Sequence, residues 1–214
     1  MIPLLHDFTG QTVLVFGGGT VGARKARRFA REAAVLVVSP SFADADFGGG
    51  ERVRAAPDPA DVPAWLDRVD PALVVAATDD EALNAAIAAA ARDRDVLVNR
   101  TDEHGDREWG SVVVPATVRD DPVTVAISTD GTSPALSRHL REQIEPVVAN
   151  AGAMATLAGD IREELQERYD PAERRAALRA VVRDDAVWKG LDSPGSNPRQ
   201  RASDVITDVT GDSS

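Results

Sequence analysis

The clearest chemical motif in the chain is a glycine-rich turn between an apolar run and a basic helical segment. Gly17, Gly19 and Gly22 have the spacing G-x-G-x-x-G and directly follow the run at residues 12–16. In this motif the first glycine permits a tight turn, the second lets a pyrophosphate approach the backbone, and the third lets the helix pack close to the strand. A turn that binds no ligand is the simpler alternative. We predict a dinucleotide site formed by Gly17, Gly19, Thr20, Val21 and Gly22.

The position that usually selects between NAD and NADP is unusual in this chain. The motif normally has an Asp or Glu about 20 residues further on, after the second strand, to bind the ribose hydroxyls. Here that strand is followed by Ser39, Pro40 and Ser41, which offer hydroxyl groups instead. Because no arginine follows the strand to accept a 2′-phosphate, the sequence favours NAD and leaves NADP open. We expect these three residues, with Ala77 and Thr78, to line the cofactor site.

Polar side chains also follow the last apolar run of this half of the chain. Asn99, Asp102 and His104 lie in "VNRTDEHGD". Since a ligand lies across the carboxyl ends of the strands in an open parallel sheet, we expect these residues to face the nicotinamide. A carboxylate there can remove or relay a proton while the cofactor accepts a hydride. A solvated loop residue is the alternative for Asp102, and a single loop histidine is rarely a ligand.

A hydroxyl-rich loop, "STDGTSP", stands before a helical segment that carries Arg138, His139 and Arg141. Helix N-termini favour anions, and basic clusters in an acidic protein suggest an anionic substrate. An ordinary capped helix with a solvated basic face is the alternative. We expect the substrate to contact Asn99, Ser128, Thr129, Ser133 and Arg138.

Composition excludes several classes of protein. The net charge of −11 argues against a general nucleic-acid binder, and the absence of cysteine excludes disulfides, thiolate nucleophiles and Cys-based metal sites. The sequence has no HExxH-type or Cys-pair motif, so we predict no metal site. No apolar run reaches the roughly 20 residues of a membrane span, and no signal peptide is evident, so we expect a cytoplasmic protein.

The order of the elements predicts the fold class. Strand-like runs lie at residues 12–16, 35–40, 51–56, 72–78 and 95–99, and helical segments alternate with them. This alternation predicts an α/β protein with a Rossmann-like parallel sheet. After residue 110, two strands joined by "RDDP" predict a hairpin. A helical part follows, with Ser133 and Asp170 as helix caps and a break at Pro146.

These segments predict a domain organisation. We expect an NAD-binding Rossmann-like domain at residues 1–110, a strand-rich segment of two strands and a helix at 111–150, a small helical domain at 151–192, and a disordered polar tail at 193–214.

The motifs together resemble one family. "VLVFGGGTVGARKARRF", "VVAATDDEALN", "VLVNRTD" and "VVVPATVRDDPVTVAISTDGTSPALSRHLRE" are similar, over about residues 3–145, to the precorrin-2 dehydrogenase / sirohydrochlorin ferrochelatase family, which includes the N-terminal half of siroheme synthase. The resemblance implies NAD-dependent oxidation of precorrin-2, an anionic tetrapyrrole, to sirohydrochlorin, followed in some members by iron insertion. It also implies a homodimer with residues 111–150 as the dimerisation segment, a catalytic Asp102, and a tetrapyrrole cleft bordered by residues 133–136.

Some residues depart from the family pattern, and two other functions stay open. Asp130 stands where the family commonly has a second glycine, the segment after Asp102 is more polar than expected, and His104 has no counterpart. The first alternative function is an NAD-binding regulatory module of a potassium-uptake system, which shares the glycine turn and the "ATDDE" segment. Such modules usually have an acid after the second strand and have no reason for the "SPAL" helix start. The second alternative is a dehydrogenase for another small acid.

Overall fold

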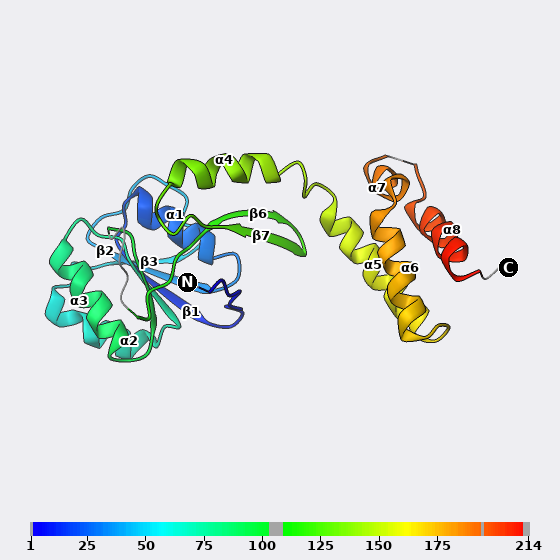
Figure 1. Cartoon of the computed structure of the whole chain (residues 1–214). Coiled ribbons are helices and arrows are strands. Elements are labelled where there is room, and N and C mark those ends of the chain that lie inside the picture. The colour runs from blue at the N-terminus through cyan, green and yellow to red at the C-terminus, as the bar shows by residue number, and fades with distance from the viewer. Residues whose placement is uncertain (1, 103–108, 194, 212–214) are drawn as a thin grey trace. The chain divides into compact units, whose positions relative to one another are not determined.

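The computed structural model describes residues 2–102, 109–193 and 195–211, and the chain forms two compact units (Figure 1). The first unit comprises residues 1–114 and 130–132, and the second comprises residues 115–129 and 133–214. Among the described residues, no helix combines the length and the apolar character needed to cross a membrane.

The first unit is built on a parallel sheet of five strands in the order β3-β2-β1-β4-β5. The strands are β1 (Thr12–Phe16), β2 (Ala34–Ser39), β3 (Glu51–Arg54), β4 (Leu73–Ala76) and β5 (Leu97–Arg100). The chain runs outward from β1 to β3 and then returns to place β4 on the other side of β1. The carboxyl ends of β1 and β4 therefore form the topological switch point at which ligands bind in open parallel sheets. The predicted Rossmann-like sheet is confirmed.

Helices cover both faces of this sheet because its central strands are apolar on both sides. Val13 and Val15 pack with Ala23 and Ala26 of α1 (Thr20–Phe29) on one face. The alternate residues Leu14 and Phe16 pack on the other face, in a cluster shared with α2 and α3. That face is covered by a 3-10 turn (Pro59–Asp61), α2 (Val62–Val69) and α3 (Glu81–Arg92). The period-two alternation of β1 thus fixes where the glycine turn and the helix after it must lie.

The second unit begins with an antiparallel hairpin of β6 (Ala116–Asp120) and β7 (Val123–Ile127), as the sequence predicted. The helices that follow are α4 (Pro134–Ile144), α5 (Ala151–Gln166), α6 (Pro171–Arg183), α7 (Asp185–Asp192) and α8 (Pro198–Thr210). The Ser133 and Asp170 side chains accept hydrogen bonds from the first turns of α4 and α6, which confirms both predicted caps. The helical break at Pro146 is also confirmed, since α4 ends at Ile144.

The prediction of a disordered tail from residue 193 is wrong. Residues 198–210 form α8, whose Ala202 and Val205 are buried in a cluster with residues of α5, α6 and α7. The Asn197 side chain caps the helix by accepting a hydrogen bond from the Gln200 N–H. Arg201 reinforces the packing through an ion pair with Asp184 at 2.9 Å. Although the segment is polar overall, Ala202, Val205 and Ile206 are spaced three and four residues apart and lie on one helix face. That face is enough to pack the helix against a neighbouring hydrophobic core.

Candidate active site

The glycine turn joins β1 to α1 through two contacts that leave no room for a side chain. Gly17 has a φ of +115°, and a Cβ on it would lie 2.2 Å from the carbonyl oxygen of Ala77. A Cβ on Gly22 would lie 1.9 Å from the carbonyl oxygen of Gly17. The fold itself therefore requires glycine at both positions, because no L side chain fits at such distances.

Gly19 differs from these two glycines because no atom of the described residues fills the space beside it. A Cβ built on Gly19 meets nothing within 4 Å among the described residues. Gly19 is the N-cap of α1, and no side chain in the described part of the chain caps that helix, whose first turn has no acidic residue. The helix N-terminus therefore presents backbone N–H groups and a partial positive charge beside open space, which fits the pyrophosphate of a dinucleotide.

The other residues predicted to bind the cofactor lie along the carboxyl edge of the same sheet. Ser39 is the buried last residue of β2, and Pro40 and Ser41 follow it exposed. Ala77 and Thr78 follow β4 and are half-buried; the Ala77 N–H donates to Phe16 at the end of β1. Thr20 is exposed and Val21 half-buried in the first turn of α1. The structure thus brings these residues to one edge of the sheet, and their role in binding stays a prediction.

A buried amide connects the end of β4 to Asp102. Asn84, on α3, accepts hydrogen bonds through its Oδ1 from the Thr78 hydroxyl at 2.7 Å and from the Thr78 N–H at 3.2 Å. Its Nδ2 donates to the Thr78 carbonyl at 3.0 Å and to Asp102 Oδ2 at 3.1 Å. Because every polar group of this side chain is occupied, Asn84 fixes Asp102 relative to the carboxyl end of β4, which is part of the switch point.

Asn84 was missed by reasoning from the sequence, although a signal was present. It is a polar residue in the Ala-rich segment "ALNAAIAAAA", on the face that packs against the sheet, and only 1% of it is exposed. A buried polar side chain in an apolar helix face needs hydrogen-bond partners, so its position already indicated a network near the strand ends.

Arg100 holds the Asp102 carboxylate through two parallel hydrogen bonds. Arg100 Nε lies 3.1 Å from Oδ1 and Arg100 Nη2 lies 2.7 Å from Oδ2, and the two side chains are only 15% and 21% exposed. The hydrogen bond from Arg100 lowers the pKa of Asp102 below its ordinary value, with a further contribution from Asn84, while partial burial opposes the change. Asp102 is therefore a fixed, ionised carboxylate at neutral pH.

Asn99 has a structural contact in addition to its position at the sheet edge. It is buried in β5, and its Nδ2 donates to the Val112 carbonyl at 2.7 Å. Its Oδ1 is buried and has no hydrogen-bond partner among the described residues. His104, the third residue of this predicted group, lies outside the described residues. Within the part of the chain that the structure describes, no group of three or more His, Asp or Glu side chains has the arrangement of a metal site.

The other residues predicted to contact the substrate belong to the second unit. The Thr129 hydroxyl bonds to the Ser133 carbonyl and to the Ser137 hydroxyl, each at 3.0 Å. Ser133 Oγ accepts from the Leu136 N–H, so both hydroxyls stabilise the start of α4. Ser128 is exposed, and Arg138 is largely exposed and pairs with Glu142 at 3.1 Å. These contacts confirm an ordinary capped helix start, while a role in binding the substrate stays a prediction.

Comparison with known proteins gives two family matches that follow one another along the chain. Residues 4–116 match the family described as "Putative NAD(P)-binding", and residues 120–145 match the family described as "Sirohaem biosynthesis protein central". The first match covers the glycine turn, Asn84 and Asp102, and the second ends at Glu145, the C-cap of α4.

Individual relatives agree with these matches. A precorrin-2 dehydrogenase of Methanosarcina barkeri is 33% identical and aligns over 96% of this chain and 93% of its own length. A siroheme synthase of Sodalis glossinidius is 38% identical over 78% of this chain, which corresponds to only 35% of that longer protein. The solved structure of SirC, a precorrin-2 dehydrogenase, has the same fold, with a TM-score of 0.68 over 99% of this chain at 22% identity.

Proposed function

The chain belongs to the precorrin-2 dehydrogenase family, and from this membership we propose that it oxidises precorrin-2 to sirohydrochlorin with NAD as the hydride acceptor. The family was anticipated from the sequence motifs, in preference to a potassium-uptake module. The observation that carries the proposal is the Arg100–Asp102–Asn84 arrangement beside the end of β4, at the same sheet edge as the open turn at Gly19. The family match supports the binding of NAD or NADP without distinguishing between them, and the choice of NAD is part of our proposal.

The proposed reaction removes one hydride and one proton from precorrin-2. When NAD is bound, its nicotinamide accepts the hydride. Loss of the hydride leaves positive charge on the tetrapyrrole, and a fixed carboxylate at Asp102 stabilises that charge. The proton then passes to Asp102 or through it to water, and the low pKa of Asp102 favours its rapid release. Arg100 and Asn84 keep the carboxylate in one orientation throughout.

The direct test is a turnover assay with purified protein. Precorrin-2 and NAD are mixed with the full chain, and the sirohydrochlorin absorbance is followed alongside the formation of NADH. The proposal predicts that both signals rise together in a one-to-one ratio. A protein that binds the dinucleotide yet leaves precorrin-2 unchanged would contradict the proposed reaction.

Asn84 is proposed as a positioning residue for Asp102, and replacement by aspartate tests this role. The Asn84→Asp side chain has nearly the same shape, but it puts a second carboxylate where the amide now lies 3.1 Å from Asp102 Oδ2. Two carboxylates this close cannot both ionise easily, so the pKa of the pair rises. We expect the acid limb of the kcat/KM profile to move to higher pH, with a lower kcat below that limb.

A second variant separates this effect from simple loss of stability. Asn84→Ala removes the hydrogen bonds to Thr78 as well as the one to Asp102, and it should destabilise the first unit by about 1–3 kcal/mol. The remaining pair of Asp102 and Arg100 keeps a lowered pKa, so the acid limb should stay near its wild-type position. Identical pH profiles for wild type and Asn84→Asp would remove Asn84 from the mechanism.

Ser128, Thr129, Ser133 and Arg138, all in the second unit, are proposed to bind the substrate, and a contact by Asn99 of the first unit stays a separate prediction. Precorrin-2 is an anionic tetrapyrrole with several carboxylates, and guanidinium and hydroxyl groups are suitable partners for them. The exposed Arg138 guanidinium is the member of this group best able to exchange its pairing with Glu142 for a substrate carboxylate.

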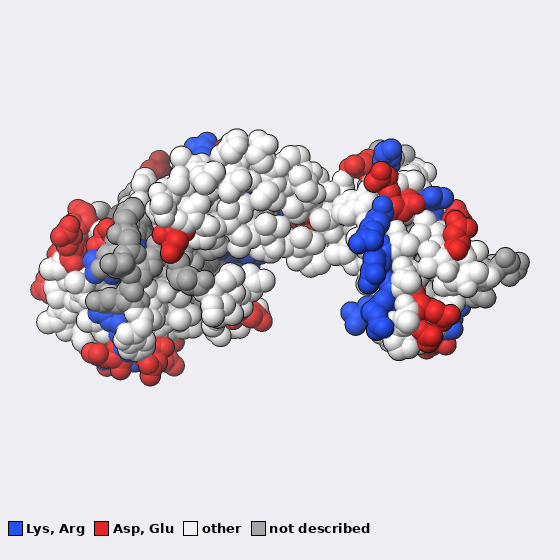
Figure 2. Space-filling view, in the orientation of Figure 1, with Lys and Arg blue, Asp and Glu red and all other residues white. Residues whose placement is uncertain are grey.

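A homodimer is also proposed, with α4 at the interface. None of the residues of α4 is buried, and Leu136 and Leu140 are 47% and 37% exposed on successive turns. Figure 2 shows that the surface over α4 and the hairpin is largely uncharged on the side displayed. An apolar helix face of this kind is normally covered by another surface.

Light scattering of the purified protein tests the homodimer. We expect the wild-type mass to be twice that of the chain, and we expect Leu140→Glu to shift the equilibrium towards monomer, because the introduced charge is costly to bury. Ala135→Glu adds the same charge to an exposed position on another face of the same helix and serves as the control. A wild-type monomer at the concentration of the assay, or equal effects of the two variants, would contradict this interface.

A further inference from the structure

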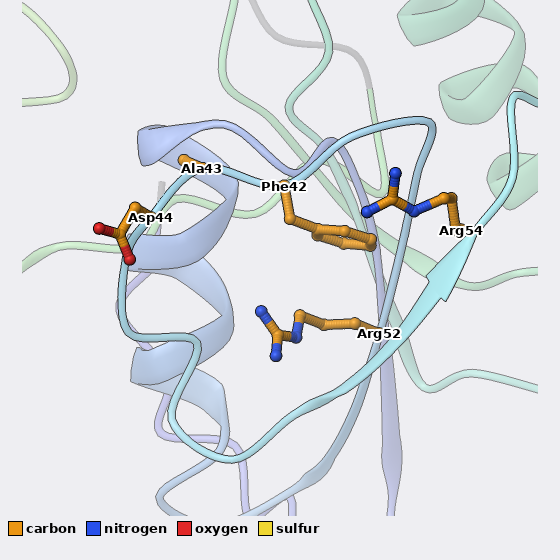
Figure 3. A pocket seen from close by; sticks show the side chains of 5 residues that line it. All are labelled: Phe42, Ala43, Asp44, Arg52 and Arg54. Carbon is orange, nitrogen blue, oxygen red and sulfur yellow. The ribbon is translucent and has the colours of Figure 1, made fainter.

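An open pocket of about 500 Å³ lies beside the end of β2. Phe42, Ala43 and Asp44 line it from the loop that follows β2, and Arg52 and Arg54 line it from β3. Figure 3 shows both guanidinium groups near the Phe42 ring, while the Asp44 carboxylate lies at the far rim. The pocket therefore has an aromatic wall, two cationic groups and one anionic group.

The pocket adjoins the glycine turn directly. The Ala43 N–H donates to the Gly18 carbonyl at 2.8 Å, which ties the pocket loop to the turn. A Cβ on Gly18 would lie 2.2 Å from the Ser41 carbonyl and 2.8 Å from Phe42 Cδ1. A dinucleotide with its pyrophosphate at the start of α1 consequently directs its adenosine ribose towards this pocket.

The sheet register explains why two arginines lie here. Arg54 pairs with Ser39, the last residue of β2, and Arg52 pairs with Val37. Since residues two apart share a face of a strand, both arginines extend on one side of the sheet while Val53 packs into the core on the other. No arginine directly follows β2 in the sequence, but the neighbouring strand β3 supplies Arg52 and Arg54.

The charges in the pocket favour an anion over a neutral ligand. Within the described residues, neither arginine forms an ion pair with a carboxylate. The guanidinium carbon of Arg52 lies 5.7 Å and 5.6 Å from the ring centroids of Phe42 and Phe47, which holds it over the pocket wall. Two arginines against Asp44 leave one net positive charge in a pocket towards which the adenosine ribose is expected to point.

We propose that Arg52 and Arg54 bind the 2′-phosphate of NADP, so that this protein uses NADP as well as NAD. Guanidinium groups donate paired hydrogen bonds to phosphate oxygens, and Asp44 can accept a hydrogen bond from a ribose hydroxyl when the 2′-phosphate is absent. Only the use of NADP in catalysis rests on the proposed dehydrogenase function. The binding itself requires no tetrapyrrole.

Calorimetry with two nucleotides tests the proposal without any turnover. The purified full chain is titrated with 2′,5′-ADP and with 5′-ADP, which differ only in the 2′-phosphate, at one fixed ionic strength. We expect 2′,5′-ADP to bind about tenfold or more tightly, as expected for hydrogen bonds between charged groups. In the turnover assay, NADP should then support the oxidation of precorrin-2.

Variants assign the effect to the pocket. Arg52→Gln and Arg54→Gln should each reduce the ratio of the two affinities, and the double variant should bring it close to one. Arg31→Gln, an exposed residue just after α1, removes the same charge outside the pocket and should leave the ratio unchanged.

Three results would overturn the proposal. The first is equal affinity of the wild type for 2′,5′-ADP and 5′-ADP. The second is a ratio of these two affinities that the pocket variants do not change. The third is a set of pocket variants that raise only the KM for precorrin-2, which would make the pocket a site for a tetrapyrrole carboxylate. Failure of precorrin-2 to react, with the affinity ratio as expected, would instead contradict the proposed function and leave the 2′-phosphate site intact.

Discussion

Asp102→Asn is expected to reduce kcat for the oxidation of precorrin-2 by a factor of about 10²–10⁴, which is the usual contribution of a positioned acid–base group. Asparagine keeps the size of the side chain, and its single oxygen can accept hydrogen bonds from Arg100 Nη2 and Asn84 Nδ2. Its amide nitrogen cannot accept the hydrogen bond that Arg100 Nε now donates to Oδ1. It can neither accept the departing proton nor stabilise positive charge on the tetrapyrrole. The loss should therefore appear in kcat with little change in the affinity for NAD.

The measurement is steady-state turnover together with calorimetric titration of NAD. Asp93→Asn, at the exposed C-terminal end of α3, removes one negative charge from the same unit and is the control. Because the variant leaves the Arg100 guanidinium partly buried without its carboxylate, urea unfolding should be measured in parallel. Wild-type turnover in a folded Asp102→Asn protein would exclude Asp102 from the chemistry.

The glycine turn offers a second large effect, which distinguishes folding from cofactor binding. In Gly22→Ala the new methyl group would lie 1.9 Å from the Gly17 carbonyl oxygen, so the turn must open. We expect a loss of about 1–3 kcal/mol in the free energy of unfolding, together with loss of dinucleotide binding. In Gly19→Ala the methyl group meets no atom within 4 Å in the part of the chain that the structure describes. That variant should fold like the wild type and still lose most of its affinity for NAD and NADP.

Unfolding curves and nucleotide titrations of the two variants test this distinction. Gly159→Ala is the control: the position lies within α5, a Cβ there meets no atom of the described residues within 4 Å, and alanine is favoured in a helix interior. The control should keep wild-type binding and gain slightly in stability. If Gly19→Ala binds dinucleotides as tightly as the wild type, the open space at the turn is not the pyrophosphate site.

Much of the fold was predictable because its signals are local. The apolar run before G-x-G-x-x-G, the alternation of strands and helices, and the hairpin at "RDDP" each depend on residues close together in the chain. The caps at Ser133 and Asp170 are local as well. The tail was the exception, since α8 depends on a core contributed by α5, α6 and α7, which its own polar composition does not reveal.

By itself, the sequence determined the Rossmann-like sheet, the glycine turn, the family and the position of Asp102 along the chain. Only the tertiary structure decided what surrounds these residues. Asn84 reaches Asp102 across 18 positions, and Arg54 reaches the end of β2 through strand pairing. The physical reason is that parallel strands bring distant segments together at one sheet edge. Arg100 and Asn84 lower the pKa of Asp102 at this edge. Their contacts depend on strand register and burial, which no short stretch of sequence encodes.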